Sequence, residues 1–146
     1  MASKTKRIIL LSVSLVLVAI LVLGFLKYNK GPRNVKNSKG IPVSAKVLYL
    51  LYNSDSLSAA KKYSGDVLMV TGEVHQVSEN AQHQKVLLLK TESEQAYINC
   101  TLEESLIDCK QGDIVHVKGI CNGIGQGYPD MGIKADVYLI RCFIFK

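Results

Sequence analysis

The chain has 146 residues, enough for one ordinary domain and a short additional segment. Its formal net charge is +6, but eight of the 18 basic residues precede residue 40 and all 12 acidic residues follow it. The part after residue 40 therefore carries ten bases against 12 acids, a formal charge of −2. A nucleic-acid-binding domain normally concentrates basic residues on its folded part, so this charge distribution disfavours that class.

Residues 8–26, "IILLSVSLVLVAILVLGFL", are a run of 19 residues without a charge. As an α-helix the run would be about 28 Å long, close to the thickness of the hydrocarbon layer of a membrane. One alternative is a cleaved signal peptide, whose apolar region is usually ~7–15 residues long and ends at a small-residue cleavage site. The other is a buried core helix, which would carry a polar stripe. The sequence has neither feature, so we expect a single-pass membrane anchor preceded by a basic tail at residues 1–7.

Residues 27–41, "KYNKGPRNVKNSKGI", are polar and basic and predict a linker between the anchor and the domain. Three bases precede the span and five follow it closely, which by the positive-inside rule places the domain in the cytoplasm. The opposite orientation leaves the short charged tail in the cytosol, which is the simpler route of insertion. We expect an extracytoplasmic domain, and the sequence leaves the other orientation open.

The domain, residues 42–146, is predicted to begin with two short helices. Asn53 is typical of a helix end, and either Asp55 or Ser56 is suited to begin the second helix. The pattern predicts a helical hairpin that packs on the elements that follow. Apolar positions recur at helical spacing in both segments: Val47, Leu48, Leu51 and Tyr52 in the first, and Leu57, Ala60 and Tyr63 in the second.

The rest of the domain predicts mostly β-strands. Thr101 followed three residues later by Glu104 is a capping box and predicts a short helix at residues 101–109. The order of three strands, a helix and two strands is that of the OB-fold, a mainly β, five-stranded Greek-key barrel. Gly72 within the long first strand allows the sharp bend that such a barrel needs. The expected strands are residues 66–77, 85–90, 95–100, 112–121 and 135–145.

Four segments, "YSGDVLMVTGEV", "YINC", "GDIVHVKGICNG" and "DVYLIRC", resemble the tRNA-anti-like family. The resemblance covers residues 46–145 and includes Asn53 and Tyr63 in the preceding helices. It implies a small OB-fold domain of a kind that is often membrane-anchored, and it implies nucleic-acid binding only by analogy of fold. Cys100, Cys121 and Cys142 match the three cysteines of the family, whereas Cys109 is an addition.

The glycines between the last two strands predict a flexible rim loop. They follow a strand but open no helix, whereas phosphate cradles need a helix N-terminus. No cysteine or histidine pair has the spacing of a zinc site, so we expect neither a metal nor a cofactor. His75 and His116 are predicted to be solvated on outer faces, and His83 lies in a turn. The glycines of this loop are Gly123, Gly125, Gly127 and Gly132.

Strand alternation places three cysteines inside the barrel. Lys118 and His116 are expected to face water, which turns Cys121 inward. Cys100 and Cys142 also face inward from neighbouring strands and are the predicted disulfide pair, while a simple hairpin register places Cys121 opposite Asp136. Inward thiols are alternatively apolar fillers. A catalytic thiol needs exposure and a neighbouring base, so we expect no enzymatic activity and no catalytic residue.

OB barrels bind ligands across the face of their second and third strands and the adjoining loops. One exposed aromatic residue is few for a binder of single strands, which stacks bases on several aromatic side chains in a basic groove. We therefore expect a membrane-tethered module that binds a protein, a peptide or an envelope glycan, with an oligonucleotide-binding OB domain as the alternative. The candidate binding face comprises Lys85, Lys90, Gln95, Tyr97 and Asn99, with Tyr128 and Lys134 on the rim loop.

Overall fold

The computed structural model describes residues 16–23, 34–104 and 108–145. The chain divides into two units, residues 1–33 and 34–146. In the first unit, residues 16–23 are helical and their apolar side chains are exposed. Among the described residues, no helix has both the length and the apolar character to cross a membrane. The predicted anchor at residues 8–26 lies only partly within the described residues, because 8–15 and 24–26 fall outside them.

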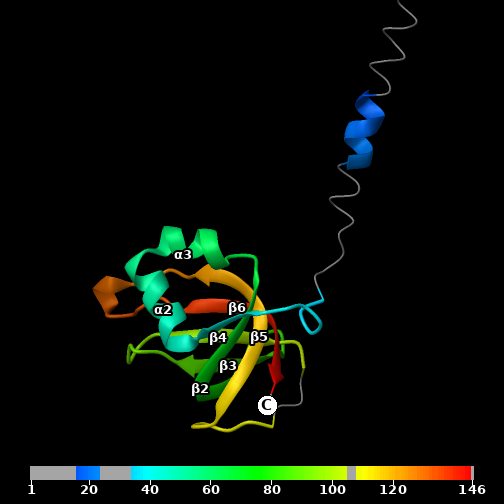
Figure 1. Cartoon of the computed structure of the whole chain (residues 1–146). Helices are drawn as coiled ribbons and strands as arrows, with labels where there is room; N and C mark the ends of the chain where they lie inside the picture. The colour runs from blue at the N-terminus through cyan, green and yellow to red at the C-terminus, as the bar shows by residue number, and fades with distance from the viewer. Residues whose placement is uncertain (1–15, 24–33, 105–107, 146) are drawn as a thin grey trace, which may run out of the picture. The chain divides into compact units, whose positions relative to one another are not determined.

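The second unit is built on a closed five-stranded barrel (Figure 1). Its strands follow the order β2-β3-β4-β6-β5, and β5 pairs back with β2 to close the barrel. All neighbours run antiparallel except β4 and β6, which are parallel. The mainly β class and the five predicted strands are therefore confirmed. The strands are β2 (Val67–Glu79), β3 (Lys85–Lys90), β4 (Tyr97–Leu102), β5 (Ile114–Ile124) and β6 (Val137–Phe145).

Strand β2 closes the barrel because it pairs with two different strands along its 13 residues. Its first half, Val67–Glu73, pairs with β5, and its second half pairs with β3 from Val74 onward. The register shifts between Val74 and Gln76. Gly72 lies just before this shift, where a Cβ atom would be 2.9 Å from Cβ of Ala45 and 3.2 Å from Cβ of Leu89. A glycine is therefore needed here because three segments approach each other closely.

The predicted helix at residues 101–109 is wrong where the structure describes it. Thr101 and Leu102 belong to β4, where Thr101 pairs with Val86 and Leu102 with Cys142. Residues 103–104 and 108–110 are not helical, and residues 105–107 lie outside the described part. Leu102 is buried in the core, so sheet pairing and burial override the local capping signal.

Strand β1 (Ile41–Ser44) runs parallel to the start of β2 and leads into α2 (Ala45–Ser54) and α3 (Ser56–Tyr63). Oγ of Ser44 accepts a hydrogen bond from the Val47 amide at 3.2 Å, and Oδ1 of Asp55 accepts one from the Ser58 amide at 3.0 Å. The predicted helical hairpin is confirmed, with Asp55 as the cap of its second helix. Val47 and Leu57, two of the apolar positions in that helical pattern, are exposed.

The two helices pack against one end of the barrel and contribute to its core (Figure 1). Tyr52 of α2 is the largest fully buried side chain. Its hydroxyl lies 3.1 Å from Oγ of Ser64 and 3.2 Å from Sγ of Cys121 on β5. Burial, with the thiol of Cys121 nearby, raises the pKa of Tyr52 to about 12. The phenol therefore stays neutral and joins the helices to the barrel through hydrogen bonds.

The segment that precedes β1 packs on the barrel from Asn34 onward. Val35 is 1% exposed, and Nζ of Lys118 on β5 donates to the carbonyl oxygen of Lys36 at 3.1 Å. Nζ of Lys118 also lies 4.6 Å from the centre of the Phe145 ring. The prediction that Lys118 faces water is therefore wrong, because this segment covers it. The compact unit also begins within the predicted linker at residues 27–41.

A bulge in β6 shifts the register that the sequence predicted. Arg141 has a φ of 54°, and β6 contains one extra residue here relative to both β4 and β5. Cys121 pairs with Leu139, not with Asp136 as a simple hairpin implies, and a second register shift lies between Cys121 and Gly123 on β5. The bulge also resets the alternation of the strand, so Leu139 and Cys142 are both buried.

We expect Gly72→Ala to lower the free energy of unfolding by about 1–3 kcal/mol, because the new methyl group overpacks the contact with Ala45 and Leu89. Chemical denaturation measures this loss. The matched test combines Gly72→Ala with Ala45→Gly, which removes the Cβ atom of Ala45, one of the two atoms that the new methyl group would contact. If the double variant is as destabilised as the sum of the two single variants, close packing at Gly72 is not the cause.

Candidate ligand-binding face

Two aromatic rings lie against each other on the outer face of the barrel where β3 ends and β4 begins. The rings of His75 on β2 and Tyr97 on β4 are stacked, with centroids 4.5 Å apart and an angle of 18° between their planes. Tyr97 pairs with Lys90 in the last rung between β3 and β4. His75 lies within the register shift of β2. Strand pairing thus fixes Tyr97, and the bulge brings His75 next to it.

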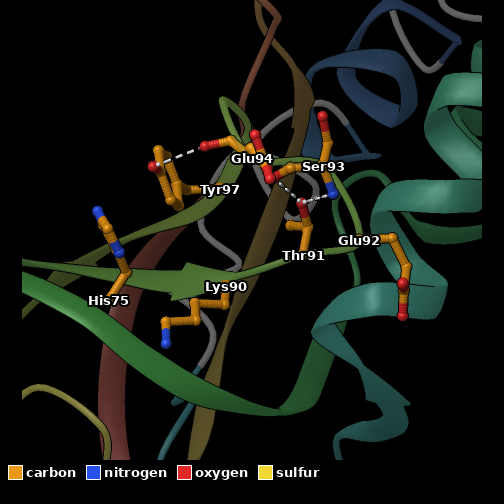
Figure 2. A pocket seen from close by; sticks show the side chains of 7 residues that line it. All are labelled: His75, Lys90, Thr91, Glu92, Ser93, Glu94 and Tyr97. Atoms are coloured by element: carbon orange, nitrogen blue, oxygen red, sulfur yellow. Dashed lines mark hydrogen bonds between the residues drawn. The ribbon is translucent and has the colours of Figure 1, made fainter.

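These rings form one wall of a cavity of about 260 Å³ (Figure 2). The remaining wall comes from the end of β3 and the β3–β4 loop, which runs from Lys90 towards α2 in the picture. Each lining side chain carries at least one polar or ionisable group. The lining residues are His75, Lys90, Thr91, Glu92, Ser93, Glu94 and Tyr97.

Hydrogen bonds within the β3–β4 loop hold the wall of this cavity in shape. Oγ1 of Thr91 donates to the carbonyl oxygen of Ala96 at 2.6 Å and accepts from the Ser93 amide at 3.1 Å. The hydroxyl of Tyr97 donates to the carbonyl oxygen of Glu94 at 3.1 Å. These bonds join both ends of the loop to its middle, so the rim does not depend on a bound ligand for its conformation.

The carboxyl group of Asp136 positions the start of β4. Its Oδ1 accepts a hydrogen bond from the Tyr97 amide at 2.8 Å. The pKa of Asp136 is raised overall, because the effect of burial exceeds the opposite effect of the hydrogen bonds from the Tyr97 amide and the Asn99 side chain. Asn99 lies between Leu88 on β3 and Tyr138 on β6. The β5–β6 connection therefore supports the backbone that carries Tyr97.

The basic side chains of this face have acidic or polar partners. Nζ of Lys90 pairs with Oε1 of Glu73. Lys46 of α2 pairs with Glu92 at 3.2 Å, and Nζ of Lys134 donates to Oγ of Ser93 at 2.7 Å. Two of these three lysines, Lys90 and Lys46, are thus paired with neighbouring carboxylates, whereas the partner of Lys134 is a neutral hydroxyl.

One further hollow adjoins the cavity across the β3–β4 loop, and a second hollow adjoins the first. One, of about 670 Å³, shares Glu92, Ser93 and Glu94 with the cavity and continues along α2 past Asn53. The other, of about 470 Å³, lies between α2 and the β5–β6 connection and includes the aliphatic residues Ile124 and Ile133. The two hollows share Tyr49, Asn53 and Lys134.

The structure brings together five of the seven residues predicted for the binding face. Lys90 and Tyr97 line the cavity, and Gln95 and Lys134 line the adjoining 670 Å³ hollow. Asn99 follows Tyr97 on the same face of β4. Lys85 lies at the other end of β3, where it pairs with Glu79 at 2.7 Å. Tyr128 is 56% exposed on the β5–β6 connection and lines none of the hollows described above.

Sequence reasoning missed His75 and the four loop residues 91–94. His75 was predicted to be a solvated side chain, but it is half-buried and stacked on Tyr97. Alternation along β2 does turn it outward, and the OB strand order places that strand next to β3. The register shift at His75, which brings the two rings into contact, could not be predicted from the sequence.

Three cysteines are buried thiols inside the barrel, as the strand alternation predicted. The thiols of Cys100 and Cys142 are hydrogen-bonded neighbours, and burial together with this contact raises the pKa of Cys142. A Cβ atom at Gly119 would lie 2.4 Å from Sγ of Cys142, so the glycine makes room for that thiol. Within residues 16–23, 34–104 and 108–145, no group of three or more His, Cys, Asp or Glu side chains could hold a metal ion.

A family model described as tRNA_anti-like matches residues 1–130 of the chain. The match includes the basic N-terminal region, α2, α3 and the strands from β1 to β5. No curated protein matches the chain.

The contact between Cys100 and Cys142 allows a specific test of the predicted disulfide. We expect protein taken from its own compartment to contain a Cys100–Cys142 disulfide, because neighbouring inward thiols need little movement to form one. The native chain is unfolded, alkylated without reductant, digested and analysed by mass spectrometry. Alkylation of all four cysteines under these conditions would contradict the disulfide.

Proposed function

Because the chain belongs to the tRNA_anti-like family, we propose that it is a non-catalytic OB-fold binding module tethered to a membrane. Its ligand lies on the outer face of β2, β3 and β4. The observation that carries the proposal is the stacked pair of His75 and Tyr97 in the wall of a pre-shaped cavity. Aromatic rings next to convergent polar groups in a cavity wall are typical of ligand sites.

The character of the thiols supports a binding role over a catalytic one. A nucleophilic cysteine needs exposure and a lowered pKa. Cys100, Cys121 and Cys142 are buried, and the pKa of Cys142 is raised by burial. The cavity itself is lined by hydroxyl, carboxylate, amine and aromatic groups, whose hydrogen bonds hold the rim.

The tether is supported by the uncharged run at residues 8–26 and the bases on both of its sides. Such a run is long enough to span the hydrocarbon layer. The compact unit begins at Asn34, only a few residues after this run. The module would therefore work close to the membrane surface, and we place it on the extracytoplasmic side.

Oligonucleotide binding is the second candidate, because the family is named for anticodon-binding domains and stacked aromatic rings suit nucleobases. The pairing of Lys90 with Glu73 and of Lys46 with Glu92 opposes it. Binding of phosphates depends on basic side chains that release counterions. On this face Lys90 and Lys46 already have carboxylate partners.

Photo-cross-linking in intact cells tests the binding face. A photoreactive phenylalanine derivative replaces Tyr97 in one variant and Lys85, at the opposite end of β3, in the control. Tyr97 on β4 pairs with Lys90, which lies about 17 Å from Lys85 along β3. We expect an adduct at position 97 only. Equal adducts at both positions, or none at position 97, would exclude this face as the site, and a nuclease-sensitive adduct would favour the oligonucleotide candidate.

Fractionation of cells tests the tether. We expect the full-length chain to remain with membranes after carbonate extraction, because a span of about 20 apolar residues is not released by high pH. Protease added to intact cells or spheroplasts should degrade the domain. Recovery of the chain in the soluble fraction without its first residues would contradict the anchor and identify residues 8–26 as part of a cleaved signal peptide.

A further inference from the structure

We propose that the ligand of this face is a neutral oligosaccharide, one pyranose ring of which packs against the His75–Tyr97 pair. The inference rests on the proposed function and names the class of ligand. It follows from three properties of the cavity: the stacked rings, the chemistry of the lining groups and the balance of charge.

Each ring of the stacked pair has one π-face turned away from the other ring, and this face is flat, weakly negative and already ordered. A pyranose ring has a face of C–H groups, which carry slight positive charge and complement an aromatic π-face. His75 and Tyr97 immobilise each other at 4.5 Å, and the hydroxyl of Tyr97 is held by the carbonyl oxygen of Glu94. Ligand binding thus costs little side-chain entropy at this platform.

The groups around the rings match hydroxyl groups. The carboxylates of Glu92 and Glu94 are acceptors, the hydroxyl of Ser93 keeps its proton as a donor, and Nζ of Lys90 has donors beyond its bond to Glu73. Vicinal sugar hydroxyls offer donors and acceptors in the same small space. Among the seven described lining residues none is aliphatic, so an apolar peptide side chain would find only aromatic rings and the methylene groups of polar side chains as apolar partners in this cavity.

The balance of charge favours a neutral ligand. Lys90 is paired with Glu73, and Glu92 is paired with Lys46. A polyanion would have to displace these carboxylates, and a polycation would have to displace the lysines. A neutral ligand leaves both pairs in place and hydrogen-bonds to the groups that remain accessible.

The adjoining hollows favour a chain of sugars over a single one. The 670 Å³ hollow shares Glu92, Ser93 and Glu94 with the cavity and is lined further along by Asn53, Gln95 and Lys134. Amide and ammonium groups of this kind suit additional sugar residues. The test therefore uses oligosaccharides long enough to extend beyond one ring.

Nuclear magnetic resonance of the isotope-labelled full-length chain tests the proposal, in a detergent without a sugar headgroup. The probes are neutral hexasaccharides of glucose, N-acetylglucosamine, mannose and galactose, compared with an oligogalacturonate and a short oligothymidine. We expect at least one neutral hexasaccharide to shift the amide resonances of Ser93, Glu94 and Tyr97. Tyr97→Leu should weaken this binding about tenfold or more, whereas Tyr97→Phe should keep it within a few-fold.

His75→Leu is the second variant. It removes one ring of the pair but leaves the residues of β4 unchanged, and it should also weaken binding. Tyr128→Leu is the matched control, an exposed tyrosine outside the cavity, and should bind as the wild type does. The proposal is overturned if no neutral hexasaccharide shifts these amides, if the anionic probes do so instead, or if both ring variants bind normally. An adduct at position 97 in the cross-linking experiment would then still support the binding module. Failure of the oligosaccharide proposal can therefore be distinguished from failure of the proposed function.

Discussion

The whole domain depends on the closure of the barrel through β2. This one strand pairs with β5 along its first half and with β3 along its second, so it must bend and shift register midway. Gly72 permits the bend because its missing side chain leaves room for Ala45 and Leu89. The register shift that follows brings His75 against Tyr97. Closure and the candidate site therefore have the same structural cause, and a change that relaxes β2 is expected to alter both.

The second constraint lies in β6, which pairs with β4 in parallel and with β5 in antiparallel orientation. Its bulge at Arg141 shifts the register towards both of these strands. The bulge places Cys142 beside Cys100 in the core and requires the glycine at position 119. At the start of the same strand, Asp136 holds the amide of Tyr97. The buried thiol pair and the candidate site thus depend on adjoining parts of β4 and β6.

Lysine–carboxylate pairing distinguishes the charge of this OB face from that of a uniformly basic groove. The basic residues at the cavity are paired with carboxylates that come from β2 and the β3–β4 loop. The large positive charge of the chain belongs to the region before residue 40. An assay with the intact chain would therefore detect polyanion binding by that basic region even if the barrel contributes nothing, because such binding is electrostatic and independent of sequence.

The sequence by itself determined the features that are local to a segment. Alternation of apolar and polar residues predicted the five strands, and helical spacing with a capping residue such as Asp55 predicted the helical hairpin. Tyr97 was predicted to be an aromatic residue on the surface. Tertiary structure alone decided the remainder: Lys118 is buried under a segment about 80 residues away in the chain, residues 101–102 are strand despite a capping box, and His75 meets Tyr97. The physical reason is that bulges and close approaches arise where strands from distant parts of the chain must share hydrogen bonds, and no local pattern encodes that requirement.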